Sequence, residues 1–473
     1  MKNIYLIINL LKSATRCLTA KNAEDTQRPR GMLLIFANRG DKLCFLQIKL
    51  VLLLFIVFPV TLMAQQPDST ESQLDHYLVV AAENNPSLKA EYQKYLSALE
   101  TVPQVHALPD PELSFGYFIN PIETRVGPQQ ARFGLTQMFP WFGTLGARGD
   151  AATEMAKAGF EGFREARNRL FFEVQKKWYR LYHIDQSIRI MQENISILET
   201  FESLAMRRYE AGQVGQVDVL RVQIEKEDLK TRLELIKDNR KVSRREFREL
   251  LNVGAGEQIL IADSLESRGL ELSLQELEQQ IMNQNARLSR LDYEAASAKN
   301  SIEAARKDGL PKFGLGVDYI VTGERDMALT DNGRDAVMAR AGIQIPLYRK
   351  KYRAKQKQAQ IELHRVQNRK AAAQNRLLTQ LEQAIRDYDD AQRRVSLYRN
   401  VQIQRTRQAI NILTEQYATS ATDFEELLRL QRKLLDYELA RETAQVDQNT
   451  AVAYIEYLYG KYNVKLESVE GIK

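Results

Sequence analysis

The segment YEAGQVGQVDVLRVQ at residues 209–223 has a counterpart in YATSATDFEELLRLQ at residues 417–431. Both segments begin with tyrosine and end in Leu-Arg-x-Gln, and they are offset by 208 residues. Gly212 and Gly215 suit a tight turn in the first copy. The two segments are therefore predicted to be the tips of two helical hairpins.

Two proline-free tracts, residues 141–310 and 347–473, contain these tips. Both tracts are rich in Glu, Lys, Arg, Gln, Leu and Ala, a composition that favours long helices. Apolar side chains also fall on a- and d-like heptad positions: Phe171, Val174, Trp178, Leu181, Ile188 and Ile195 in the first tract, and Leu381, Tyr388 and Val395 in the second. This spacing is typical of helices that pack as coiled coils.

A stretch with β-strand character precedes each tract and ends in proline. Pro140 and Pro346 are 206 residues apart, close to the offset of the tips, so the chain is predicted to contain an internal duplication of roughly 200 residues. Apolar residues alternate with small or polar ones in four segments, residues 113–119, 132–139, 313–321 and 337–345. The alternation predicts two β-hairpins, one in each repeat.

Strands of this length, with one apolar and one small or polar face, are typical of transmembrane β-barrels. A soluble sheet that covers the helices is the alternative. Four strands cannot close a barrel, for which about eight are needed, and an open edge in lipid leaves backbone groups unpaired. If the strands cross a membrane, the chain must oligomerise, and three copies would supply twelve strands.

Aromatic side chains cluster on and beside these strands. We expect eight of them to lie near a membrane interface: Phe115, Tyr117, Phe133, Phe139, Trp141, Phe142, Phe313 and Tyr319. The alternative is that they belong to a protein core.

The positive charge of the chain is confined to its N-terminal part. The 473 residues carry a net charge of +6, with a pI near 9.0. Residues 1–64 contain nine Lys or Arg and three acids, which leaves 58 basic and 58 acidic side chains in residues 65–473. A neutral body argues against nucleic acid as a partner.

The apolar run at residues 50–63 follows Lys42 and Lys49 and predicts a secretory signal peptide. A retained signal anchor is the alternative, and the long preceding stretch suggests that translation starts at Met32 or nearby. Both cysteines, Cys17 and Cys44, precede the run, so the mature chain is expected to lack disulfides and a lipid anchor.

Sequence motifs for catalysis or cofactor binding are absent. The chain has no HExxH, CxxC, P-loop or GxGxxG pattern, and its four histidines are scattered. We therefore expect no enzyme activity, no cofactor and no resident metal.

The two repeats and the Tyr-x-x-Gly-x-x-x-x-x-Asp-x-Leu-x-x-Gln pattern at residues 209–223 resemble the TolC-type outer-membrane efflux family. The resemblance covers roughly residues 75–464. The blocks DPELSFGY (residues 110–117) and QMFPWFG (residues 137–143) are similar to its heavy-metal-efflux branch, related to CzcC and CusC.

The resemblance implies a homotrimer. Its twelve strands form an outer-membrane barrel, its helices form a periplasmic α-barrel, and the helical tips dock onto a periplasmic adaptor (membrane fusion) protein and an inner-membrane pump. The residues expected to dock are Tyr209, Gly212, Gly215, Tyr417 and Ser420.

The resemblance also implies an acidic ring at the closed periplasmic mouth. By motif position the ring falls on Glu426, with Asp218 as its first-repeat counterpart and Asp423 nearby. One turn beyond stand Arg429 and Arg221, which puts a second acidic ring in doubt and favours Glu–Arg pairs between subunits. The alternative is that these acids are an ordinary solvated helix start, stabilised by the helix dipole.

The expected organisation is mainly helical with a transmembrane β part. It comprises a leader at 1–64, repeat 1 at 65–252 (strands about 111–139, tip about 209–223), a linker at 253–272, repeat 2 at 273–466 (strands about 312–346, tip about 417–431) and a tail at 467–473. The predicted function is a passive exit duct of a tripartite efflux system, for heavy-metal cations. A drug-efflux duct, a type I protein-secretion duct and a pore-free periplasmic scaffold are the alternatives.

Overall fold

The computed structural model describes residues 70–326, 328, 330–418 and 424–462. These residues belong to one compact unit, residues 67–473. The predicted signal peptide, both cysteines, Ser420, Asp423 and the C-terminal tail lie outside the described residues.

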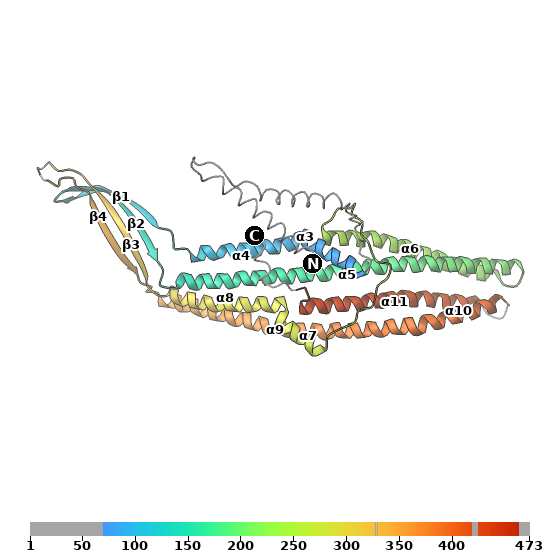
Figure 1. The fold of residues 1–473 in the computed structure, drawn as a ribbon. Helices are drawn as coiled ribbons and strands as arrows, with labels where there is room; N and C mark the ends of the chain where they lie inside the picture. The colour runs from blue at the N-terminus through green and yellow to red at the C-terminus, as the bar shows by residue number, and fades with distance from the viewer. Residues whose placement is uncertain (1–69, 327, 329, 419–423, 463–473) are drawn as a thin grey trace, which may run out of the picture. The chain divides into compact units, whose positions relative to one another are not determined.

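Long helices dominate the described part of the chain (Figure 1). Helix α5 (Thr144–Glu210) runs unbroken for 67 residues and returns as α6 (Gln216–Leu251). In the second repeat, α9 (Arg349–Leu397) continues through a π-helix (Tyr398–Gln402) into α10 (Ile403–Ala418), and α11 (Phe424–Tyr459) returns. The prediction of long helices in both proline-free tracts is confirmed.

The two repeats differ in length between the proline and the tip tyrosine, and the longer repeat contains the π-helix. The second repeat has two more residues between its proline and its tip tyrosine than the first, because the offsets are 206 and 208. A π-helical turn takes up extra residues within a continuous helix. The insertion therefore leaves the second hairpin unbroken.

Each repeat also begins with a pair of shorter helices, which the sequence interpretation had not identified. These are α3 (Thr70–Asn84) with α4 (Pro86–His106), and α7 (Leu274–Gln284) with α8 (Ala286–Asp308). Asn85 caps α4 and donates a hydrogen bond to the Leu250 carbonyl oxygen at 2.9 Å. Asn285 caps α8 in the same way and donates to the Leu458 carbonyl oxygen at 2.8 Å. Each buried cap thus ties an entering helix to the end of its hairpin.

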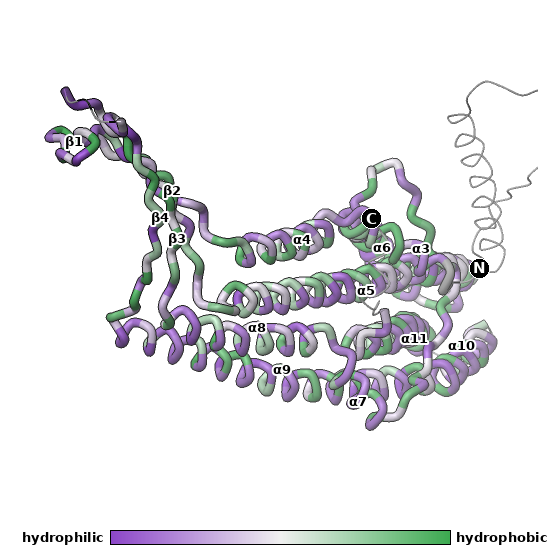
Figure 2. The backbone as a smooth tube through the Cα atoms, turned by 60° about the vertical axis from the view of Figure 1, so that its left-hand side comes forward, coloured by the Kyte–Doolittle hydropathy of each residue, from purple (hydrophilic) through white to green (hydrophobic). Residues whose placement is uncertain are grey.

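A four-stranded antiparallel sheet extends beyond the ends of α4, α5, α8 and α9, opposite the hairpin tips (Figures 1 and 2). Its strands are β1 (Glu112–Thr124), β2 (Gly127–Phe139), β3 (Lys312–Thr322) and β4 (Ala336–Gln344), in the order β1-β2-β3-β4. The predicted hairpins are thus present, and pairing of β2 with β3 joins the two repeats. Within the described chain β1 and β4 are edge strands, so the predicted twelve-stranded barrel is not formed by one chain.

The core lies along the seams between helices. Trp178, Val174 and Leu181, which the heptad spacing places on the packing face of α5, are fully buried. In the second repeat Leu381 is fully buried and Tyr388 nearly so. The coiled-coil interpretation of these positions is confirmed.

The residues predicted to link the repeats, 253–272, contain no helix or strand and cross the surface of α11. The buried Asn449 holds this segment, called the strap here, against α11. Its Nδ2 donates to the Glu266 carbonyl oxygen, and its Oδ1 accepts from the Arg268 backbone N–H, both at 2.9 Å. The Arg268 side chain also forms an ion pair with Glu456. Gln186 Nε2 of α5 donates to the Asp263 carbonyl oxygen at 2.9 Å, so the strap contacts both repeats.

Candidate functional site

The first hairpin tip is closed by a glycine. Gly212 has φ 72°, and the Gln213 N–H donates to the Arg208 carbonyl oxygen while the Gly212 N–H donates to that of Tyr209, both at 2.9 Å. This pattern is a Schellman motif, in which a left-handed residue satisfies the last carbonyls of the helix. Gly215 then precedes α6 without a side-chain cap, and Asp218 lies in the first turn of α6.

A buried arginine joins the two tips. The guanidinium of Arg208, 6% exposed, lies 4.3 Å from the centre of the Tyr417 ring and donates to the Tyr417 carbonyl oxygen. Its Nε donates to Gln213 Oε1 at 3.2 Å. The Tyr417 hydroxyl in turn donates to Asp218 Oδ2 at 3.4 Å. Arg208, Tyr417 and Asp218 therefore link the end of α5, the end of α10 and the start of α6.

Ion pairs form a second link between the hairpins, about one turn further along α6 and α11. Arg221 Nε lies 3.2 Å from Glu425 Oε2, and Arg432 Nε lies 3.0 Å from Glu225 Oε2. Arg432 also approaches Glu425 at 3.7 Å. These four side chains alternate in charge between the two helices, so they attract one hairpin to the other.

Two of the three carboxylates predicted to form the gate, Glu426 and Asp218, are paired within one chain. Glu426 forms an ion pair with Arg429 on its own helix, with Arg429 Nε at 2.9 Å from Glu426 Oε2. Asp218 has Arg221 at 3.7 Å in addition to Tyr417. The arginines expected to pair across subunits thus have carboxylate partners in their own chain. An acidic ring across several chains stays a prediction.

The residues predicted to dock onto an adaptor are not equally accessible. The Tyr209 side chain is 42% exposed at the surface of the first tip. Tyr417 is 1% exposed and packs against Phe424, with ring centres 4.8 Å apart. The Tyr417 side chain is therefore an internal brace of the tip, although sequence position alone suggested a docking role.

The sheet presents one exposed apolar face. Strand register places Phe115 beside Phe133, and Phe133 beside Tyr319. The exposed side chains on this face also include Leu113, Tyr117, Leu135, Leu315, Val317, Val337 and Ile343. Such a large apolar face, left uncovered in one chain, marks an interaction surface.

The other predicted interface aromatics gather where the sheet meets the helices. Trp141 stacks on Phe313 with ring centres 5.7 Å apart, and Phe142 lies 6.2 Å from Phe313. Phe139 pairs with Phe313 in the strand register. The aromatic side chains thus occupy both the apolar face and the helix-proximal edge of the sheet, and their place at a membrane interface stays a prediction.

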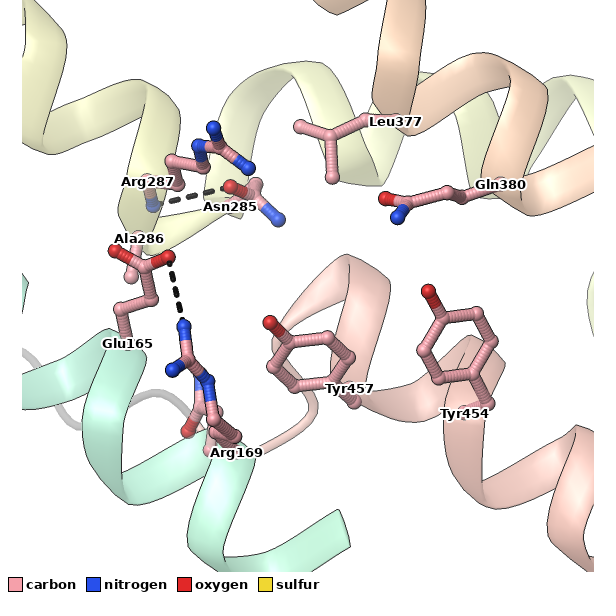
Figure 3. Close-up of a pocket in the computed structure, with 10 residues that line it drawn as sticks. Glu165, Arg169, Asn285, Ala286, Arg287, Leu377, Gln380, Tyr454 and Tyr457 are labelled. Carbon is pink, nitrogen blue, oxygen red and sulfur yellow. Dashed lines mark hydrogen bonds and ion pairs between the residues drawn. The ribbon is translucent and has the colours of Figure 1, made fainter. Parts of the chain in front are cut away.

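A polar pocket of about 220 Å³ lies where α5, α8, α9 and α11 meet (Figure 3). On one side, Glu165 forms ion pairs with Arg169 at 3.6 Å and with Arg290 at 2.8 Å. On the other side, Tyr454 and Tyr457 stack with ring centres 5.8 Å apart. The Glu165–Arg290 pair, from α5 to α8, therefore joins the two repeats at this pocket.

Within the described ranges, no group of three or more His, Cys, Asp or Glu side chains is placed to hold a metal ion. None of the helices described there is long and apolar enough to cross a membrane.

Residues 78–253, nearly all of the first repeat, match the family model described as outer membrane efflux protein. This repeat belongs to the outer membrane efflux protein family. The resemblance to TolC-type proteins drawn from the tip motif is thereby confirmed. No curated protein sequence matches the chain.

Solved outer-membrane channels share the fold of this chain. The outer-membrane channel OprN superposes with a TM-score of 0.69 at 16% identity, covering 82% of this chain and 90% of OprN. CusC gives 0.67 at 17% identity (80% and 92% covered), and VceC from Vibrio cholerae gives 0.68 at 16% (82% and 96%). The three TM-scores and identities are nearly equal, so they do not distinguish one branch of the family from another. The assignment to the heavy-metal-efflux branch therefore stays a prediction.

Two residues that link the hairpin tips were missed in the sequence. Arg208 stands immediately before the motif tyrosine, but the equivalent second-repeat residue is Gln416, so the comparison of repeats gave no signal. Arg432 corresponds to Ile224 and was missed for the same reason. A search for charged residues at which the repeats differ would have found both.

Tyr417 makes the hairpin tips sensitive to high pH. Burial, and secondarily the Asp218 carboxylate, raise its pKa to about 12 from the usual 10.0. Between these values the folded state holds the proton that the unfolded state has lost. Stability should therefore be complete below pH 10 and decrease towards pH 12, by at most about 1.4 kcal/mol per pH unit.

The measurement is the unfolding midpoint of wild type and Tyr417→Phe across this range. The advantage of wild type over the variant should shrink above pH 10. Tyr209→Phe, at the exposed surface of the same tip, is the matched control for loss of a tyrosine hydroxyl. Parallel curves for wild type and Tyr417→Phe would contradict the pKa assignment.

Proposed function

We propose that the protein is the outer-membrane exit duct of a tripartite efflux system, and that it acts as a homotrimer. The observation that carries this proposal is the two-faced sheet. One face is apolar and exposed, the other is mostly small or polar, and the edge strands β1 and β4 lack outer partners within the described chain. A sheet of this kind is stable in lipid only when further strands close it into a barrel.

A second exposed apolar surface supports assembly with further copies. Five side chains form a stripe along α6, on the side opposite the buried face that contacts α5: Val217, Leu220, Ile224, Leu235 and Val242. At 100° per residue all five fall within one narrow sector of the helix. In a trimer this stripe would pack against a neighbouring copy and continue the coiled-coil wall.

In the proposed duct the hairpin tips form the periplasmic gate. The buried Arg208–Tyr417 contact and the ion pairs of Arg221 and Arg432 hold the two hairpins of a chain together. Movement of the second hairpin away from the first would have to break these links. A periplasmic adaptor and an inner-membrane pump, the partners implied by the resemblance, would engage the tips and supply the free energy for transport.

The cargo predicted from the sequence is heavy-metal cations, with drugs or secreted proteins as the alternatives. A passive duct needs no resident metal site, so the cargo depends on the pump and on the charge of the duct wall.

The test is to separate the membranes of cells that produce the full chain and to record the purified protein in planar bilayers. We expect a trimer in the outer-membrane fraction that dissociates on heating and conducts ions. A monomeric protein in the periplasmic fraction, with no conductance, would instead identify a pore-free scaffold and exclude the duct.

A further inference from the structure

Three charged side chains stand together on the polar face of the sheet. They are Arg132 on β2, Asp318 on β3 and Arg340 on β4. Arg132 Nη2 lies 2.5 Å from Asp318 Oδ2, and Arg340 Nε lies 3.9 Å from the same oxygen. One carboxylate thus organises two guanidinium groups from the strands on either side of it.

The sheet register explains how the carboxylate is held. Asp318 pairs with Gly134 across β2 and β3, and its Oδ1 occupies the space over Gly134. A methyl group at Gly134 would stand 2.5 Å from that oxygen and 2.6 Å from Ser114 Oγ, closer than real contacts allow. Glycine at this position is therefore required for Asp318 to lie flat on the sheet.

The carboxylate of this cluster is buried, and the two guanidinium groups are partly exposed. The Asp318 side chain is 1% exposed, whereas Arg132 and Arg340 are 37% and 45% exposed. Arg340 is further positioned by Thr136, whose Oγ1 accepts a hydrogen bond from its Nη2 at 2.6 Å. A guanidinium carries five N–H donors, and these contacts occupy few of them. The exposed surface of the cluster is therefore cationic.

The other charged residues on this face of the strands leave its net charge positive. Glu112 and Lys312 lie at the helix-proximal ends of β1 and β3 and offset each other. Each chain therefore contributes two arginines against one buried aspartate, and three chains would contribute six against three. Exposed positive charge on the wall of a narrow pore attracts anions and repels cations.

We propose that Arg132 and Arg340 form an anion-selective element on the lumen wall, so that the duct favours anionic cargo over free cations. This proposal rests on the proposed function, because only in a closed barrel does the polar face of the sheet line a lumen. A metal carried by this duct would then have to leave as an anionic complex, in place of the free cations predicted from the sequence.

The first measurement is the reversal potential of the reconstituted full-length protein in a KCl gradient. The double variant Arg132→Gln/Arg340→Gln should lower the chloride-to-potassium permeability ratio by about threefold or more, because the attraction for anions is lost. Arg132→Lys/Arg340→Lys should keep the wild-type ratio. Arg386→Gln/Arg393→Gln is the matched control, because it removes two exposed arginines from α9.

If the double variant does not assemble, Arg340→Gln alone is used in its place, because this variant keeps the closer Arg132–Asp318 pair. A channel whose permeability ratio is unchanged by the glutamine substitutions would overturn the proposal and leave the proposed function standing. A lysine variant that behaves like the glutamine variant would also overturn it.

A second measurement does not require conductance. Binding of the trisulfonated dye pyranine to the detergent-solubilised full chain, followed by fluorescence anisotropy, should weaken about tenfold in Arg132→Gln/Arg340→Gln and remain unchanged in the α9 control. If wild type forms no channels, the proposed function fails, and pyranine binding then decides whether the anion site exists. Equal pyranine binding by wild type and Arg132→Gln/Arg340→Gln would overturn the anion site.

Discussion

Arg221→Gln/Arg432→Gln combined with Tyr417→Phe is expected to raise the open probability of the reconstituted duct about tenfold. The three substitutions remove the ion pairs to Glu425 and Glu225 and the hydroxyl contact with Asp218. Half-exposed ion pairs contribute about 0.2–1 kcal/mol each, and about 1.4 kcal/mol shifts an equilibrium tenfold. Single-channel recording measures the change directly.

Two substitutions serve as controls for this prediction. Lys237→Gln removes a cation whose partner, Glu234, lies on the same helix, and should leave gating unchanged. Arg429→Gln separates two accounts of the gate, because its pair with Glu426 does not connect the hairpins of one chain. An increase in open probability for Arg429→Gln, with none for the triple variant, would contradict the prediction. That result would show that contacts between subunits hold the gate closed, and that the links within a chain do not.

Ionic strength gives an independent check on the same links. Raising KCl from 0.1 M to 1 M shortens the Debye length from about 10 Å to about 3 Å. The wild-type open probability should therefore rise with salt. The triple variant, which lacks the ion pairs, should respond less.

Val317→Arg is expected to reduce the outer-membrane trimer at least about tenfold. Val317 lies on the central strand β3, on the apolar face, and is 52% exposed in one chain. In a membrane barrel this face meets lipid, where an arginine near the midplane costs about 2–4 kcal/mol per chain. The measurement is the heat-sensitive trimer band in the outer-membrane fraction.

The same substitution distinguishes the membrane sheet from the soluble sheet considered as its alternative. On a water-exposed face, a change from valine to arginine would alter stability by only about 0.5 kcal/mol. Val317→Thr, similar in volume and uncharged, is the control and should assemble almost normally. Normal trimer levels for Val317→Arg would show that this face does not contact lipid.

Local patterns predicted most of the fold. Pro140 and Pro346 separate strand from helix because proline can neither donate a backbone hydrogen bond nor continue a helix interior. Period-two alternation located all four strands, and the heptad spacing identified Trp178 and Leu381 as core residues. The short helices α3, α4, α7 and α8 were missed, although Asn85 and Asn285 are recognisable caps.

The contacts at the tips could not be predicted from motif positions. Arg221 and Arg429 are equivalent in the two repeats, yet Arg221 reaches Glu425 on the other hairpin while Arg429 pairs with Glu426 on its own helix. Their surroundings differ, because each hairpin of the chain packs against the other with unlike neighbours. Tyr417, placed among the docking residues by its motif, is buried for the same reason.

The sequence by itself determined the helices, the strands and the two faces of the sheet, because each depends on neighbouring residues and a short repeat period. Only the tertiary structure decided which charges meet. Arg208 reaches Tyr417, and Asp318 lies between Arg132 and Arg340, across separations of up to 209 residues. Strand register and helix packing decide which side chains meet. Both bring together residues that do not occupy equivalent positions in the two repeats.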